Sequence, residues 1–187
     1  MAGEDALYLL FQRRSIRHYE PRPVEPAKVE LLLKAAMAAP SACNNQPWEF
    51  VVVTEPAGMD AIREELPMAR YNAPMAIAVC GNTRLCPGTK GLWVLDCSAA
   101  LQNILLAATA LGLGSVWIGV HGVAPFVVKV QRLLGLPDHV EPLGIAYVGY
   151  AAEAKDARTQ YNAKRIYQEI YNPERKHRAR PKNLKHL

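Results

Sequence analysis

Residues 92–120 read LWVLDCSAALQNILLAATALGLGSVWIGV, and no Asp, Glu, Lys or Arg occurs from Cys97 to Val128. A charge-free run of this length is typical of a membrane-spanning helix. Amides, glycines and a proline nevertheless interrupt it, at Gln102, Asn103, Gly112, Gly114, Gly119 and Pro125. We therefore expect a soluble protein with a helix over 92–111, a glycine turn and a buried strand over 116–120. The helix is apolar almost all round, which predicts burial on every side, in part by a second subunit.

Shorter elements are expected on both sides of this stretch. Apolar periodicity and proline positions predict earlier helices through Leu7–Phe11, from Pro26 to about Pro40, and from about Ala57 to Leu66. Earlier strands are expected at Phe50–Val53 and Met75–Cys80. Later elements are a helix at Phe126–Leu134, a strand at Leu143–Val148 and a last helix at Lys164–Tyr171. Helices and strands intermix around one core, which indicates an α+β or α/β layered domain.

The charge is unevenly distributed along the 187 residues. The net charge is +5, but residues 174–187 contain six basic residues and one acid, and the rest contains 16 of each. We expect a single domain over 1–173 and a solvated basic tail over 174–187, with a nucleic-acid or membrane contact as the less favoured interpretation. The first residues lack the pattern of a signal peptide, and the four cysteines lack close spacing. We therefore expect a cytoplasmic protein with free thiols and no metal site.

The usual signatures of hydrolases and nucleotide-binding proteins are missing. Gly112-Leu113-Gly114 lacks the third glycine of a dinucleotide fingerprint and runs from helix to strand, the reverse of a Rossmann turn. No G-x-S-x-G or H-E-x-x-H motif occurs, and the five histidines are scattered. A bound cofactor is therefore a better source of chemistry than a set of protein side chains.

Two segments have the residue types to hold an anionic cofactor. Arg13, Arg14 and Arg17 lie within five residues, with Ser15 among them, and guanidinium groups bind phosphate through paired hydrogen bonds. A solvated basic helix end fits this cluster equally well. The second segment, residues 40–48, reads PSACNNQPW. Its amides suit a flavin ring or ribityl chain. By itself, this segment is more typical of a loop that uses Asn for turns and capping.

In this order, the two segments resemble the nitroreductase family of FMN enzymes. The matching pieces are Arg-Arg-Ser-x-Arg at 13–17 and Pro-Ser-x-x-Asn-x-Gln-Pro-Trp at 40–48. Weaker matches are Gly112-Leu113-Gly114, Trp117-Ile118-Gly119 and Gly149–Glu153, so that the similarity runs from about residue 8 to 160. The resemblance implies an α+β fold of the three-layer α/β/α type, with a mixed, mainly antiparallel sheet. It also implies an intertwined homodimer with flavin sites between the subunits.

The family's binding residues carry over to matching positions of this sequence. The phosphate and ribityl contacts are Arg13, Arg14, Ser15 and Arg17, with Lys155 and Arg158 closing from the C-terminal side. Ile118 and Gly119 present backbone near the reactive edge of the ring. Contacts from the other subunit are expected at Pro40, Ser41, Ala42, Asn44 and Gln46.

The chemistry that the resemblance implies is electron transfer from NADH or NADPH, through FMN, to a small planar acceptor such as a nitroaromatic or quinone, in a ping-pong sequence. No acid or base stands out; His121 is a candidate proton donor, although a turn histidine explains it better. The alternative is a non-catalytic flavin-binding or redox-sensing protein.

Two features depart from longer family members. About ten residues, Asn82–Gly91, occupy the place of a helical insertion over the active site, so that the pocket is expected to be open or covered by another segment. Cys43 has no role in the family pattern, and we expect a small buried hydrophobic residue rather than a redox thiol.

Overall fold

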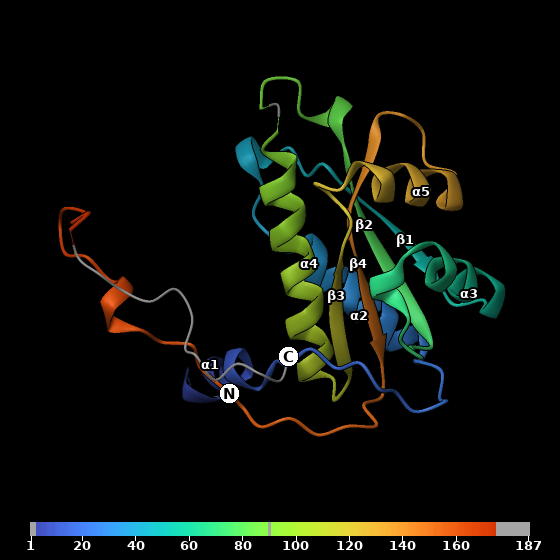
Figure 1. Ribbon diagram of the computed structural model, residues 1–187, viewed down its shortest axis with the longest axis horizontal. Helices are drawn as coiled ribbons and strands as arrows, with labels where there is room; N and C mark the ends of the chain where they lie inside the picture. Colours follow the sequence, from blue (N-terminus) through green and yellow to red (C-terminus); the bar gives the residue numbers. More distant parts are fainter. Residues whose placement is uncertain (1–2, 90, 175–187) are drawn as a thin grey trace. The chain divides into compact units, whose positions relative to one another are not determined.

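The structure is a computed structural model that describes residues 3–89 and 91–174. Four strands form one sheet in the order β1-β2-β4-β3, and every neighbouring pair is antiparallel (Figure 1). The strands are β1 (Trp48–Val53), β2 (Met75–Asn82), β3 (Gly114–Gly119) and β4 (Val140–Gly149). The central strands β2 and β4 are buried almost throughout, because helices cover both faces of the sheet.

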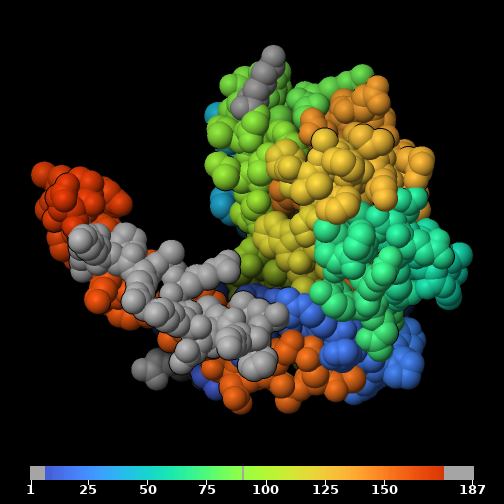
Figure 2. Space-filling model, in the orientation of Figure 1, coloured from blue at the N-terminus to red at the C-terminus, as the bar shows by residue number. Residues whose placement is uncertain are grey.

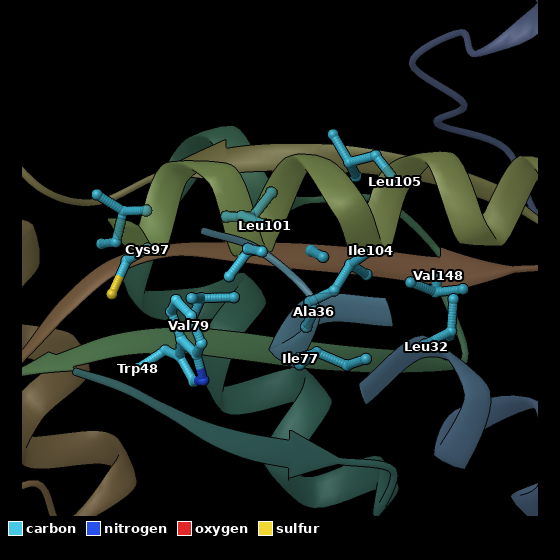
Figure 3. Close-up of a cluster of buried hydrophobic side chains, with 14 of the residues drawn as sticks. Leu32, Ala36, Trp48, Ile77, Val79, Cys97, Leu101, Ile104, Leu105 and Val148 are labelled. Carbon is cyan, nitrogen blue, oxygen red and sulfur yellow. The ribbon is translucent and has the colours of Figure 1, made fainter. Parts of the chain in front are cut away.

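The helices lie in two layers. They are α1 (Gly3–Gln12), α2 (Pro26–Met37), α3 (Pro56–Glu65), α4 (Trp93–Ala110) and α5 (Ala124–Leu134). Short 3-10 turns are η1 (Ala42–Asn44), η2 (Pro67–Ala69), η3 (Thr83–Leu85) and η4 (Ala163–Arg165). The α2 and α4 layer packs Leu32, Leu101 and Ile104 against Ile77 and Val79 of the sheet (Figure 3).

The other face of the sheet carries α3 and α5. Met59 and Ile62 of α3 and Val130 of α5 pack with Ile145 and Tyr147 of β4. Two helical layers around a sheet confirm the α+β class and the three-layer arrangement. The four strands are antiparallel throughout, and the one parallel pairing within the described ranges is an isolated bridge between Ser15 and Ser115.

Helix α4 is the central helix of the first layer, and its burial is one-sided. Eight of its 18 residues are buried against the sheet and α2, whereas Leu95 is 66% exposed. A single chain thus buries one side of α4, and the expected burial of its other side by a second subunit stays a prediction. By length and composition alone α4 could cross a membrane, but it serves here as a core helix of the fold.

The chain divides into two compact units, residues 1–157 and 158–187. The expected domain boundary after residue 173 stays a prediction, and residues 175–187 of the basic tail lie outside the described residues. The predicted helix over Lys164–Tyr171 is wrong, since only η4 forms there and Ile166 is already extended. Ile170 and Tyr171 are 81% and 64% exposed, so no buried apolar stripe stabilises a helix.

Glycines in the sheet make room for large aromatic residues. The Trp93 ring of α4 lies directly over Gly81 of β2, where a Cβ atom would overlap with it. The Trp117 indole likewise lies over Gly144 of β4, with its Nε1 atom 2.6 Å from the position of an added Cβ. The absence of a side chain at Gly81 therefore lets the first turn of α4 pack directly on the sheet.

We predict that Gly81→Ala destabilises the protein by about 1–3 kcal/mol, because the rigid indole has to move out of a packed core. Urea unfolding followed by circular dichroism measures this difference. Gly88→Ala is the matched control, since nothing lies within 4 Å of its added Cβ. Equal stability of the two variants would contradict the packing argument.

Candidate functional site

The basic cluster, residues 13–17, follows α1 as an extended segment at the start of β3. The Ile16 N–H donates to the Ser115 carbonyl at 2.9 Å, and Ser15 forms the parallel bridge with Ser115. The Ile16 side chain lies against Gly114, where a Cβ would approach it to 2.8 Å. The predicted glycine turn after α4 thus fixes the position of the cluster.

The segment that follows β4 lies along the chain just after the cluster. The Glu20 N–H donates to the Tyr150 carbonyl and the Ala152 N–H to the His18 carbonyl, both at 2.9 Å. The Lys155 ammonium donates to the Ser15 carbonyl at 2.6 Å. The Arg14 guanidinium donates to the carbonyl of Asp156. The structure therefore brings Lys155 to the cluster, and its contact with a phosphate there stays a prediction.

Arg17 is held through both its side chain and its backbone. Its Nε donates to the Tyr71 hydroxyl at 3.2 Å and its Nη1 to the Ser15 carbonyl at 3.5 Å. The Glu153 carboxylate accepts the Arg17 N–H at 2.6 Å. Tyr71 was not expected at the site, and Glu153 was noted only as the end of a weak family match, without a role, because both make their contacts through the tertiary fold.

Glu153 is a carboxylate among basic groups. Burial raises its pKa, but hydrogen bonds from the Arg17 backbone and from the Lys155 ammonium outweigh this effect and hold the pKa below its ordinary value. Glu153 is therefore ionised at neutral pH. It offsets part of the repulsion between the neighbouring cations.

The amide loop, residues 40–48, is the second part of the site and has a strained backbone. Cys43, Asn44 and Gln46 have φ angles of +51°, +54° and +48°, in the left-handed region that non-glycine residues seldom adopt. Such conformations cost on the order of 1–3 kcal/mol each and often occur at binding sites. Cys43 is exposed at this turn, so the prediction of a buried residue is wrong.

Side-chain hydrogen bonds hold the amide loop in this shape. The Ser41 hydroxyl accepts the Gln46 N–H at 3.0 Å, and the Gln46 amide donates to the Asn44 side chain at 3.1 Å. Asn45 donates to the Thr89 hydroxyl at 2.9 Å. The side-chain amides of Asn44 and Gln46 bond to each other, so both have fixed orientations.

Asp96 anchors the amide loop to α4. Its Oδ1 accepts the Ala42 N–H at 2.9 Å, and its side chain is 5% exposed. Its buried Oδ2 has no hydrogen-bond partner. Asp96 lies in the first turn of α4, where the helix dipole favours a negative charge. Sequence reasoning missed it, although it is the only charged residue within α4.

The end of β3 provides the remaining predicted residues. Ile118 is buried beneath α5 and α3, whereas Gly119 is exposed. The exposed His121 contacts the Trp93 ring edge-on, with ring centroids 5.0 Å apart. Figure 2 shows α4 and β3 next to each other on one face.

The cluster and the amide loop lie at opposite ends of α4. Asp96 fixes the loop at its first turn, whereas Ser115, which pairs with the cluster, lies just beyond its last turn. An 18-residue helix is about 27 Å long. One chain therefore does not bring the two groups together around one small ligand.

Two open cavities occur on this unit, one of them lined by Tyr71, the partner of Arg17. One, of about 650 Å³, is lined by Asp60, Arg63, Glu64, Arg70, Tyr71 and Asn72. The other, of about 310 Å³, lies between residues 20–23 and 54–59 and shares Arg63 and Asn72 with the first. Neither is lined by the amide loop or by Ile118 and Gly119.

Comparison with known proteins identifies the family. The model of the nitroreductase family matches residues 10–68 and 69–150. The chain belongs to the nitroreductase family. It is 40% identical over 171 residues to a provisionally assigned NADH dehydrogenase/NAD(P)H nitroreductase of Archaeoglobus fulgidus, covering 89% of this chain and 98% of the relative.

Solved structures of nitroreductase-type proteins share this fold. A provisionally assigned NADH dehydrogenase/NAD(P)H nitroreductase from Bacteroides thetaiotaomicron superposes with a TM-score of 0.86 at 39% identity, covering 91% of this chain and 100% of the other. A provisionally assigned nitroreductase from Desulfovibrio desulfuricans, solved in complex with FMN, has a TM-score of 0.75 at 28% identity, covering 89% and 98%.

In this nitroreductase-family chain the predicted residues thus form two groups. Arg13, Arg14, Ser15, Arg17 and Lys155 lie together at one end of α4. Pro40, Ser41, Ala42, Asn44 and Gln46 lie together at the other end. Arg158 belongs to the C-terminal unit, and its role stays a prediction.

We predict that Asp96→Ala weakens FMN binding by roughly 1–2 kcal/mol, because the strained loop loses its anchor on α4. Fluorescence titration of the apoprotein with FMN measures the change. Ser98→Ala is the matched control on the same helix, since the Ser98 hydroxyl bonds only to the Val94 carbonyl within α4. Unchanged affinity in Asp96→Ala would show that the loop needs no such anchor.

Proposed function

We propose that this protein is an FMN-dependent NAD(P)H oxidoreductase whose flavin sites form between two copies of the chain. The observation that carries the proposal is the separation of the basic cluster and the amide loop by the length of α4. The relative solved with FMN supports the choice of cofactor. Family membership supports the choice of reaction.

A two-fold dimer accounts for this separation. If the α4 helices of two copies lie antiparallel, the cluster of each copy meets the amide loop of the other. The surface that such a dimer needs is present, because the outer sides of α1, α2 and α4 expose several large apolar residues. These are Leu7, Tyr8, Leu10, Phe11, Leu31, Met37, Leu92 and Leu95.

Each group of residues has a chemical task in the proposed site. Arg13, Arg14, Ser15, Arg17, Lys155 and Arg158 supply the donors for the phosphate and ribityl end. Ile118 and Gly119 present backbone to the ring, with Gly119 leaving the edge open. Pro40, Ser41, Ala42, Asn44 and Gln46 of the second copy line the flavin, with amides in fixed orientations.

FMN held by these residues would supply hydride and electron-transfer chemistry. The protein holds the nicotinamide donor and then a planar acceptor, such as a nitroaromatic or quinone, over the same ring face. Because the donor leaves before the acceptor binds, the proposed reaction follows a ping-pong order. His121, exposed beyond β3, is the candidate proton donor. The proposal places the enzyme in the cytoplasm, where its four free cysteines stay reduced.

The test is an anaerobic reductive half-reaction of the FMN-loaded protein with NADH and, separately, with NADPH. We expect one or both to bleach the flavin, and an added quinone or nitroaromatic to restore its absorbance. Bound flavin that neither nucleotide reduces would indicate a non-catalytic flavin protein. Failure to take up FMN would overturn both flavin functions.

We predict that Arg14→Ala combined with Arg17→Ala weakens FMN binding by roughly 2–5 kcal/mol, because two charge-assisted contacts to the phosphate are lost. Equilibrium dialysis against FMN measures the effect. Arg132→Ala is the control, because Arg132 lies on α5 and is paired with Glu65. Full flavin retention in the double variant would remove the cluster from the proposed site.

We predict that Leu95→Glu converts the dimer to a monomer and releases FMN, because a buried unpaired carboxylate is costly at an apolar interface. Analytical ultracentrifugation and the flavin-to-protein ratio measure both effects. Val128→Glu is the matched control, since Val128 is similarly exposed, at 64%, but lies on α5. A monomeric Leu95→Glu variant with full flavin content would contradict the interface.

A further inference from the structure

We propose that Glu153 is a positioning residue of the phosphate site: it holds the backbone of the basic cluster and the Lys155 ammonium in place, without touching the phosphate. The inference rests on the proposed function and deepens it, because it assigns a role to an acid that lies among phosphate-binding cations. The contacts of one carboxylate oxygen carry the argument.

The Oε1 atom of Glu153 accepts three hydrogen bonds. The donors are the Arg17 N–H at 2.6 Å, the His18 N–H at 3.3 Å and the Lys155 Nζ at 3.0 Å. The same Nζ donates to the Ser15 carbonyl at 2.6 Å. Glu153 and Lys155 together therefore bind both ends of the stretch from Ser15 to His18, which contains the Arg17 side chain.

The pairing of the two segments does not depend on Glu153. Backbone hydrogen bonds join Glu20 to Tyr150 and Ala152 to His18, and an antiparallel bridge joins Tyr19 to Ala151. The Glu153 side chain adds contacts only at the end of this pairing that adjoins the cluster. Its removal is therefore expected to affect the cluster more than the fold.

The charge of Glu153 argues for a geometric role. A carboxylate near a bound phosphate opposes binding, since like charges repel. Any net gain in FMN affinity from Glu153 therefore has to come from the placement of donors. The Arg17 guanidinium is fixed from its other side by Tyr71 and the Ser15 carbonyl, so the backbone and the side chain of Arg17 are restrained separately.

The experiment compares FMN with riboflavin, which lacks the phosphate, on the full-length protein. Dissociation constants are measured for the wild type, Glu153→Ala and Glu153→Gln. Glu20→Ala is the control, because Glu20 is an exposed acid of the same segment and its side chain makes no hydrogen bond or ion pair within the described residues. Thermal unfolding without flavin reports on the fold.

We expect Glu153→Ala to weaken FMN by at least about tenfold and riboflavin by less than about threefold. Glu153→Gln keeps an acceptor oxygen and removes the charge, so its FMN affinity is expected to stay within about threefold of the wild type. Equal losses for FMN and riboflavin, or no loss in Glu153→Ala, would overturn the proposal.

The glutamine variant keeps the test decisive if Glu153→Ala does not fold. An FMN-specific loss of about tenfold in Glu153→Gln would show that the charge itself matters, and would also overturn the proposal. The proposed function fails separately, since in that case the wild type does not bind FMN at all.

Discussion

The burial of α4 against the sheet is the interaction on which the rest of this structure depends. Leu101, Ile104 and their neighbours fill the layer between α4, α2 and the central strands, and each fully buried aliphatic side chain contributes roughly 1.5–3 kcal/mol. This packing also sets the geometry of the site. The amide loop is attached to the first turn of α4 and the basic cluster to the strand that follows its last turn. The core therefore determines how far apart the two binding groups lie.

Much of the fold could be predicted from the sequence, because apolar periodicity and the positions of proline and glycine indicate most helices and strands. The glycines at 112 and 114 placed the end of α4 to within a residue, whereas β3 begins at Gly114, two residues before the predicted start. The helix expected over Lys164–Tyr171 failed, because a local apolar pattern does not show whether a surface exists to bury it.

The site was predictable in its residue types but not in its connections. The chemistry of arginines and amides suits anion and flavin binding, but each motif alone also fits a simpler structural role. The resemblance to a family made them candidate site residues, and their contacts with a flavin stay a prediction. Tyr71, Asp96 and Glu153 act through contacts with residues more than fifty positions away. Such partners depend on topology, which a single sequence does not display. The sequence contains one signal for Asp96, because it is the lone charged residue in an apolar helix.

Two carboxylates organise the two ends of the site by the same physical means. Asp96 fixes a strained loop through one backbone N–H, and Glu153 fixes the cluster through two. Both accept from the main chain, so they set the backbone shape and leave the amides and guanidinium groups to the ligand. An acid beside the proposed phosphate site is electrostatically unfavourable by itself. It is tolerable here because its oxygen is already occupied by donors of its own chain, and the arginine side chains remain directed by other partners.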